Sequence, residues 1–268
     1  MQTNKSIYLP EELETFRNKI ESSMISSLWM TPAKGRPSLS DSKFAGYPYL
    51  PKSHLHPKDA NGEYMPLLAQ INFAQLPFCS TFPKRKGLLQ FFLSSQFNKP
   101  SEKRMELLFQ QDYKIRYFPE ILDENQLVQD FSYLTIDSEF LIQNEMKLEF
   151  CQKLEPVSAS DYRRENLLQF TQLENEFMSN DGRTFEEIYF ENFLAAEHKL
   201  GGYPYFLEYD TRKDSAFLKK FDTLLFQIVS NDAQGIMYGD SGIIKFFINQ
   251  NDFKDLDFSK VYFIAEQF

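Results

Sequence analysis

The feature that most constrains the fold of this 268-residue chain is an internal repeat. Three short runs recur in the same order: Gly-Tyr-Pro-Tyr at 46–49 and 202–205, an apolar run around a glutamine at 67–71 and 224–228, and a glycine with six mostly apolar residues at 87–93 and 242–248. The starts of the paired runs lie 156, 157 and 155 residues apart. Three matches in one order at nearly one offset indicate a duplicated structural unit.

The repeated runs have the patterns of β-strands. Alternate residues of 67–73 and 224–228 fall into two sets, which is the period of a strand. The runs 88–93 and 243–248 are almost continuously apolar, which is typical of strands buried on both faces. The short connections within each copy favour antiparallel pairing over a parallel crossover. We therefore predict two related antiparallel β units, near residues 40–100 and 195–268.

An amphipathic helix is predicted before the first unit, from about residue 10 to residue 30. Its first residue is Pro10, which suits a helix start. Apolar residues then recur at three- and four-residue spacing, at Leu13, Phe16, Ile20, Met24 and Leu28. This stripe predicts one face that docks on the core.

An insertion at 101–194 separates the two units. It contains a predicted strand at 113–118, a weaker one at 147–154, and a segment of helical spacing at 160–179. A second helix is predicted from Thr184, where Thr184 and Glu187 form a capping-box pattern, to Gly201 as its C-cap. No linker composition divides the chain. The prediction is one α+β, mainly β domain over 1–268, with the insertion and helices packed on the outside.

The charge balance excludes some classes of partner. The chain has 38 Asp+Glu against 29 Lys+Arg, a net charge of −9, and its longest basic run is Lys84-Arg85-Lys86. Such a chain is a poor candidate for binding nucleic acid or an anionic membrane. There is no apolar run of membrane-spanning length, and the two cysteines form no paired motif. We expect a cytoplasmic protein with neither nucleic acid nor membrane as partner.

The motifs together resemble the YwqG-like family of bacterial proteins, over roughly residues 8–268. The resemblance rests on Gly46-Tyr47-Pro48, the run 68–72 and Gly87 before 89–92, and in the second half on 198–204, 225–228, Gly239-Asp240 and Gly242. It implies a predominantly β, internally duplicated fold with peripheral helices. It implies no known activity. His56, and the segment at Met237-Tyr238, depart from the family pattern, which is expected to carry aromatic residues there.

Two motifs suggest chemistry and are rejected. Gly239-Asp240-Ser241-Gly242 matches a serine-protease signature, but the histidine base and other landmarks of that mechanism are absent. We interpret it as the turn before 243–248, with Asp240 kept as a binding candidate. His54 and His56 form an H-x-H pattern without a third ligand at a recognisable spacing, so a surface loop is favoured. The sequence predicts no metal site and no cofactor.

Six residues are the candidates for a binding site. Gln70 and Gln227 are the repeated polar residues of the strands, and they either pin the Gly-Tyr-Pro loops or line a cleft between the units. His198 either caps the end of a helix or serves as a ligand-binding group or general base. We expect any pocket for a small polar molecule to include at least two members of one set: Tyr47, Gln70, His198, Tyr203, Gln227 and Asp240.

No catalytic constellation emerges from these residues. The favoured function is a non-catalytic binding or protein-interaction module, whose partner is a protein or a small polar ligand. Proteins that resemble this family occur among bacterial competition genes, which brings toxin neutralisation into consideration. The alternatives are an enzyme of unrecognised type or a small-ligand sensor that uses a cleft between the repeat units.

Overall fold

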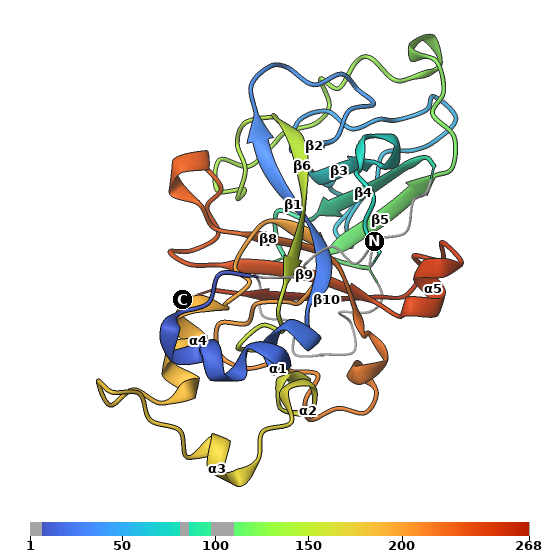
Figure 1. The fold of residues 1–268 in the computed structure, drawn as a ribbon. Coiled ribbons are helices and arrows are strands. Elements are labelled where there is room, and N and C mark those ends of the chain that lie inside the picture. The colour runs from blue at the N-terminus through green and yellow to red at the C-terminus, as the bar shows by residue number, and fades with distance from the viewer. Residues whose placement is uncertain (1–6, 81–85, 98–109, 268) are drawn as a thin grey trace.

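A single ten-stranded antiparallel sheet organises the chain (Figure 1). The computed structural model describes residues 7–80, 86–97 and 110–267, so Lys84 and Arg85 of the basic run lie outside the described residues. The strands are β1 (Ile25–Ala33), β2 (Lys43–Phe44), β3 (Leu67–Asn72), β4 (Leu88–Leu93), β5 (Tyr113–Phe118), β6 (Met146–Glu155), β7 (Lys199–Gly201), β8 (Thr223–Val229), β9 (Ile243–Ile248) and β10 (Val261–Glu266).

The order of the strands is symmetrical about its centre. It reads β10-β9-β8-β7-β1-β6-β2-β3-β4-β5, so the central pair β1 and β6 is flanked on each side by four strands in matching sequence. The β3–β4 and β8–β9 pairs are antiparallel and share an irregularity at the same place, between Leu67 and Ala69 and between Leu224 and Phe226. These pairings confirm the predicted repeat strands and the mainly β fold.

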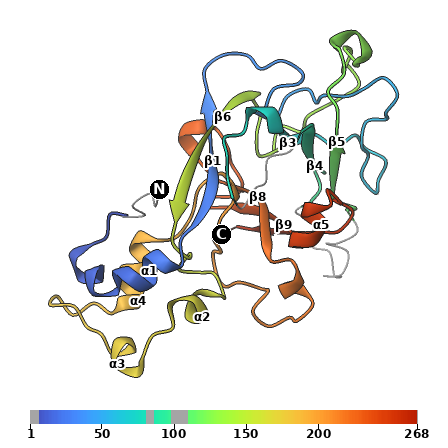
Figure 2. The same ribbon diagram turned by 45° about the vertical axis from the view of Figure 1, so that its right-hand side comes forward.

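The sheet curls so that its two halves pack face to face (Figure 2). The Phe91 ring of β4 stacks on Phe226 of β8 at a centroid distance of 4.7 Å. The Tyr113 hydroxyl of β5 donates to the carbonyl oxygen of Val261 in β10 at 2.6 Å. Aromatic side chains from both halves therefore meet in the space between the two sets of repeated strands, and their burial stabilises the packing of the halves.

Short helices form a second layer at one end of the β1–β6 pair (Figure 1). This layer contains α1 (Arg17–Ser22), α2 (Arg164–Leu168), α3 (Gln172–Asn175) and α4 (Phe185–Asn192), and a 3-10 helix, η1 (Glu11–Phe16), leads into α1. A fifth α-helix, α5 (Gln250–Lys254), lies apart from this layer (Figure 1), and its Phe253 packs in the core of the sheet. Phe16 of η1 packs edge-on against Phe185 of α4. Among the described residues, no helix has the length and apolar character needed to cross a membrane.

The predicted helix at 10–30 is wrong in its second half. Leu13, Phe16 and Ile20 are buried as expected, but the helical segment ends at Ser22 and the chain continues as β1 from Ile25. β1 pairs with β6 on one side and with β7 on the other. These long-range pairings outweigh the local helical spacing, because Leu28 can serve equally well as a core residue of a strand.

The insertion was expected on the outside, and this too is wrong. Its strand β6 lies at the centre of the sheet, where residues 147–155 pair with β1, and β5 forms one edge. The segment at 160–179 holds two short helices, α2 and α3, because Gln169 adopts a left-handed φ of 48° that ends α2. The strand predicted at 147–154 is confirmed as β6, but its charged, half-exposed residues gave no indication of its central position in the sheet.

The helix predicted at 184–200 is shorter than expected. The capping box of Thr184 and Glu187 is present and begins α4, but α4 ends at Asn192. Gly201 is the last residue of β7 rather than a helix C-cap. His198 therefore precedes a strand and cannot stabilise a helix end.

Candidate binding site

The repeated glutamines make equivalent hydrogen bonds in the two halves. Gln70 accepts from the Tyr49 amide at 2.8 Å and donates to the carbonyl oxygens of Leu39 and Asp41. Gln227 accepts from the Tyr205 amide at 2.9 Å and donates to the carbonyl oxygens of two residues of the preceding loop, Ala195 and Glu197. Both glutamines are fully buried. Each amide thus ties the last residue of the Gly-Tyr-Pro-Tyr run to the segment that precedes the run.

A buried lysine stands beside each glutamine, a feature that the sequence analysis missed. Lys43 is the strand partner of Gln70, and Lys199 is the strand partner of Gln227. The Lys43 Nζ lies 3.0 Å from Glu145, and the Lys199 Nζ lies 2.8 Å from Glu155. Burial lowers the pKa of both lysines, and the neighbouring glutamate opposes this shift in each case.

The glycine that begins each Gly-Tyr-Pro-Tyr run is required by the same arrangement of glutamine, lysine and glutamate. Gly46 and Gly202 both have a φ of 75°, which is in the left-handed region that favours glycine. A Cβ atom on Gly202 would also come within 2.0 Å of the Glu155 carboxylate. The glycine therefore permits both the turn and the close approach of the glutamate that pairs with the buried lysine.

The structure disperses the other predicted site residues. Tyr203 is buried and donates its hydroxyl to the Ser23 carbonyl oxygen at 2.6 Å, and burial raises its pKa to about 12. The Nδ1 atom of His198 accepts from the Val229 amide, so its Nε2 carries the proton and donates to Gln234. Asp240 is exposed in the turn before β9, as the sequence predicted for that segment.

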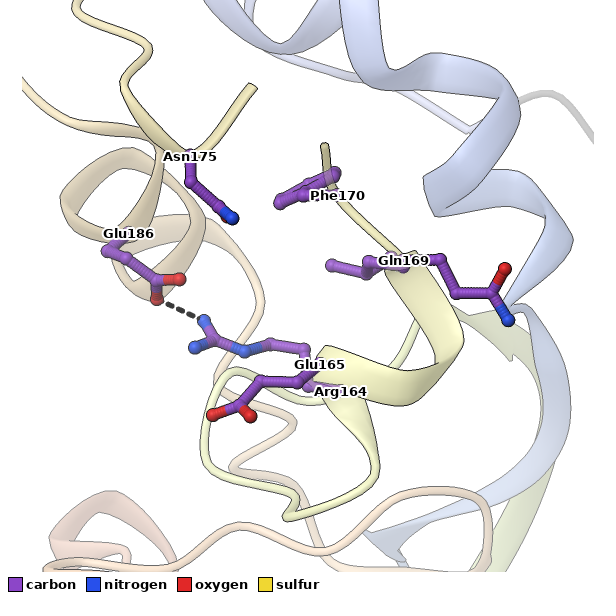
Figure 3. Close-up of a pocket in the computed structure, with 7 residues that line it drawn as sticks. Arg164, Glu165, Gln169, Phe170, Asn175 and Glu186 are labelled. Atoms are coloured by element: carbon purple, nitrogen blue, oxygen red, sulfur yellow. Dashed lines mark hydrogen bonds and ion pairs between the residues drawn. The ribbon is translucent and has the colours of Figure 1, made fainter. Parts of the chain in front are cut away.

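None of four surface cavities formed by the described residues is lined by any of the six candidates. Figure 3 shows a cavity of about 330 Å³ among α2, α3 and α4, where Arg164 is paired with Glu186. A second cavity, of about 280 Å³, lies beside Gly201 and Arg163, and a third, of about 220 Å³, beside Trp29. The fourth, of about 400 Å³, is lined by the acidic Glu11 and Glu12 and by 177–181.

Tyr47 belongs to a row of aromatic rings on the surface. Its ring stacks on Phe131 at 4.9 Å with an interplanar angle of 9°. Phe131 contacts Tyr133 at 6.0 Å, and Tyr133 contacts Tyr64 at 4.6 Å. We call Tyr47, Phe131, Tyr133 and Tyr64 the aromatic row. Its three tyrosines are between 37% and 46% exposed, whereas Phe131 is buried beneath them.

Hydrogen bonds fix the loops that carry the aromatic row. The Nε2 atom of His56 lies 2.8 Å from the Met65 carbonyl oxygen, so Nε2 carries the proton and Nδ1 accepts from the Tyr133 hydroxyl. The Asp59 carboxylate accepts from the Glu63 amide and from the Ser94 hydroxyl, which closes the turn before Tyr64. The aromatic row is therefore held in place before any partner binds.

His56 corrects the surface-loop interpretation of the H-x-H pattern. Only His54 is exposed, whereas His56 is 6% exposed and both its ring nitrogens make hydrogen bonds within the protein. Within the described ranges, no group of three His, Cys, Asp or Glu side chains is placed to hold a metal ion.

Because two histidines are buried, we predict that the folded protein loses stability in mild acid. Burial lowers the pKa of His56 and of His198 in the folded state. The unfolded chain, with a histidine pKa near ~6.5, takes up protons first as the pH falls, so the free energy of unfolding decreases. We expect urea denaturation at pH 5.5 to show lower stability than at pH 7, with a smaller difference in His198→Gln. Equal stability at the two pH values would contradict this.

Comparison with known protein families identifies a family for this chain but assigns no activity to it. The model of the family described as "Domain of unknown function (DUF1963)" matches residues 42–266. Because this match covers most of the sequence, the chain belongs to that family. A comparison with the curated proteins found no match.

Proposed function

We propose that this protein is a non-catalytic binding module that recognises a protein partner through the aromatic row. The observation that carries the proposal is the continuous ring contact from Tyr47 through Phe131 and Tyr133 to Tyr64. Tyrosine combines a large apolar face with a hydroxyl, and it is enriched in protein interfaces and among the residues that dominate binding energy.

The preorganisation of the aromatic row supports this proposal. Binding costs conformational entropy when side chains must be ordered, and rings already stacked on a buried phenylalanine avoid much of that cost. The Tyr133 hydroxyl makes a hydrogen bond to His56, and burial, with Tyr64 and Asp130 nearby, raises the pKa of Tyr133 above the ordinary tyrosine value. The charged groups Lys58, whose Nζ lies 4.2 Å from the Tyr64 ring centroid, and Asp130 border the row.

We also propose a bacterial family and a cellular location for the protein. Within the family, the motifs around Gly46-Tyr47-Pro48 and Gly202-Tyr203-Pro204 support membership of the YwqG-like bacterial proteins. A cytoplasmic single-domain protein, built from a duplicated unit and without a nucleic-acid or membrane partner, fits the acidic composition. Neutralisation of a toxin is one role that such a module would serve.

Comparative purification tests the aromatic row. We expect the partner that co-purifies from native cells with the unchanged protein to be depleted at least ~tenfold with Tyr47→Ala/Tyr133→Ala, since interface hot spots cost ~2 kcal/mol or more. The matched control is Phe190→Ala/Tyr209→Ala, which removes two aromatic residues of similar exposure elsewhere and should keep the partner. Equal recovery with both double variants would refute the proposal.

A further inference from the structure

The cavity beside Trp29 has the composition of a site for an organic cation. Trp29 of β1 is the only tryptophan of the chain, and it lines this cavity of about 220 Å³ together with Phe193 and two glutamates. The glutamates are Glu155, at the end of β6, and Glu197, just before β7. Aromatic faces with nearby carboxylates attract ammonium groups. The cavity shares no residue with the aromatic row.

Only one of the two glutamates is available to a ligand. Glu155 receives the Lys199 ammonium and the Tyr203 amide on one carboxylate oxygen, and the Trp29 indole N–H on the other at 3.4 Å. Lys199 thereby compensates its charge. Glu197 is exposed at the edge of the cavity, and its carboxylate makes no hydrogen bond or ion pair with any residue that the structure describes.

The wall that carries Glu197 is fixed by the repeated glutamine. Gln227 donates to the carbonyl oxygens of Ala195 and Glu197, both of which line the cavity. Gln227 is thus a positioning residue for this wall, although its own side chain is buried behind it.

The other half of the sheet has the corresponding positions but lacks these properties. Beside Lys199 the strand partner is Trp29, whereas beside Lys43 it is Lys147. Asp41 takes the place of Glu197 as the residue held by the glutamine, but its carboxylate already accepts from the Ser38 amide and from Gln75. An aromatic wall with a free carboxylate is therefore particular to the Trp29 side.

We propose that the Trp29 cavity binds the ammonium group of a small organic cation, with the indole and Phe193 as aromatic walls and Glu197 as the countercharge. One cation of the protein already lies near this indole, since the Lys153 Nζ is 5.5 Å from the Trp29 ring centroid. Lys153 is exposed, and its ammonium group is expected to compete with the ligand for the face of the indole ring.

Fluorescence of the single tryptophan tests this site directly. We expect choline to change the Trp29 emission in a saturable way, with an affinity at least ~tenfold higher than that of its neutral isostere 3,3-dimethylbutan-1-ol. A parallel titration with N-acetyl-lysinamide distinguishes a free small cation from a lysine side chain of another protein. If this compound binds more tightly than choline, the natural ligand is a lysine side chain. Equal affinity for choline and the neutral alcohol, or no saturable change with either cation, would overturn the proposal.

Substitutions test whether the charge of Glu197 itself is needed for choline binding. Glu197→Gln is expected to weaken choline binding at least ~fivefold and to leave the alcohol unaffected, whereas the exposed control Glu139→Gln changes neither. Lys153→Met should retain or strengthen choline binding. Loss of binding in Lys153→Met, or equal affinities in the Glu197 and Glu139 variants, would contradict the assignment. Choline binding should persist in Tyr47→Ala/Tyr133→Ala, so the two proposals fail independently.

Discussion

Replacing either repeated glutamine by methionine is expected to lower the free energy of unfolding by about 3 kcal/mol, because several buried backbone groups lose their only described partner. Gln70→Met removes the partners of the Tyr49 amide and of two carbonyl oxygens, and Gln227→Met does the same for the Tyr205 amide. Methionine keeps a similar volume, so the loss reports the hydrogen bonds rather than a cavity.

The measurement is thermal and urea denaturation of each variant. A loss of about 3 kcal/mol corresponds to a fall of roughly 6–12 °C in Tm for a chain of this size. The control is Gln152→Met on the exposed part of β6, which should stay within ~0.5 kcal/mol of the unchanged protein. Wild-type stability of both Gln70→Met and Gln227→Met would show that these amides do not hold the loops.

Arg212→Met is expected to cost about 3–5 kcal/mol, the range for removing one partner of a buried ion pair. The guanidinium of Arg212 is fully buried, donates two hydrogen bonds to Asp210 at 2.9 and 2.6 Å, and lies 4.3 Å from the Phe247 ring. Without it the Asp210 carboxylate stays buried and uncompensated. The change would be measured as the urea midpoint and the free energy of unfolding.

A second substitution distinguishes the stranded charge from lost packing. Adding Asp210→Asn to Arg212→Met removes the uncompensated carboxylate, and part of the stability should return. Arg212 also contacts Asp161, but Asp161 keeps its own ion pair with Arg163. The stability that returns in the double variant therefore reports the contribution of Asp210. No recovery in the double variant would mean that the loss comes from packing around Phe206 and Phe247, not from charge.

The repeat predicted the strands well because their burial is encoded locally. The runs at 88–93 and 243–248 are apolar on both faces, and β4 and β9 are buried along their whole length. The central strands were harder to predict. β1 carries an apolar spacing that also fits a helix, and only its long-range pairing makes it a strand. The pattern at 147–154 does predict β6, although the exposed charged residues of this strand weaken the signal and hide its central position. The duplication itself stays a prediction, supported by the matching strand order.

Part of the missed site was within reach of the sequence. Lys43 and Lys199 lie 156 residues apart, which is the offset of the Gly-Tyr-Pro-Tyr run that follows each of them. Extending the repeat three residues upstream would have marked both lysines as equivalent. A lysine among strand residues then suggests a buried partner. Glu145 and Glu155 offer no such signal, because Glu145 immediately precedes β6 and Glu155 is its last residue, so their spacing does not follow the repeat.

The aromatic row and the Trp29 cavity were beyond prediction for a different reason. Tyr47 and Tyr64 come from one long loop, whereas Phe131 and Tyr133 come from another, more than sixty residues away. No periodic pattern links the two loops, and they are aligned by backbone and side-chain hydrogen bonds between them, among which is the bond from Tyr133 to His56. Likewise, Trp29 and Glu197 meet only because β7 pairs with β1. Contacts of this kind depend on tertiary structure and not on spacing.

Site-directed photo-crosslinking in native cells tests the central claim most directly. A p-benzoylphenylalanine residue would replace Tyr47 or Tyr64 in the aromatic row, and Tyr209 at a surface of similar exposure. If the aromatic row binds a protein partner, positions 47 and 64 will cross-link to the same protein and position 209 will not. Identical cross-links at all three positions, or none at 47 and 64, would contradict the account.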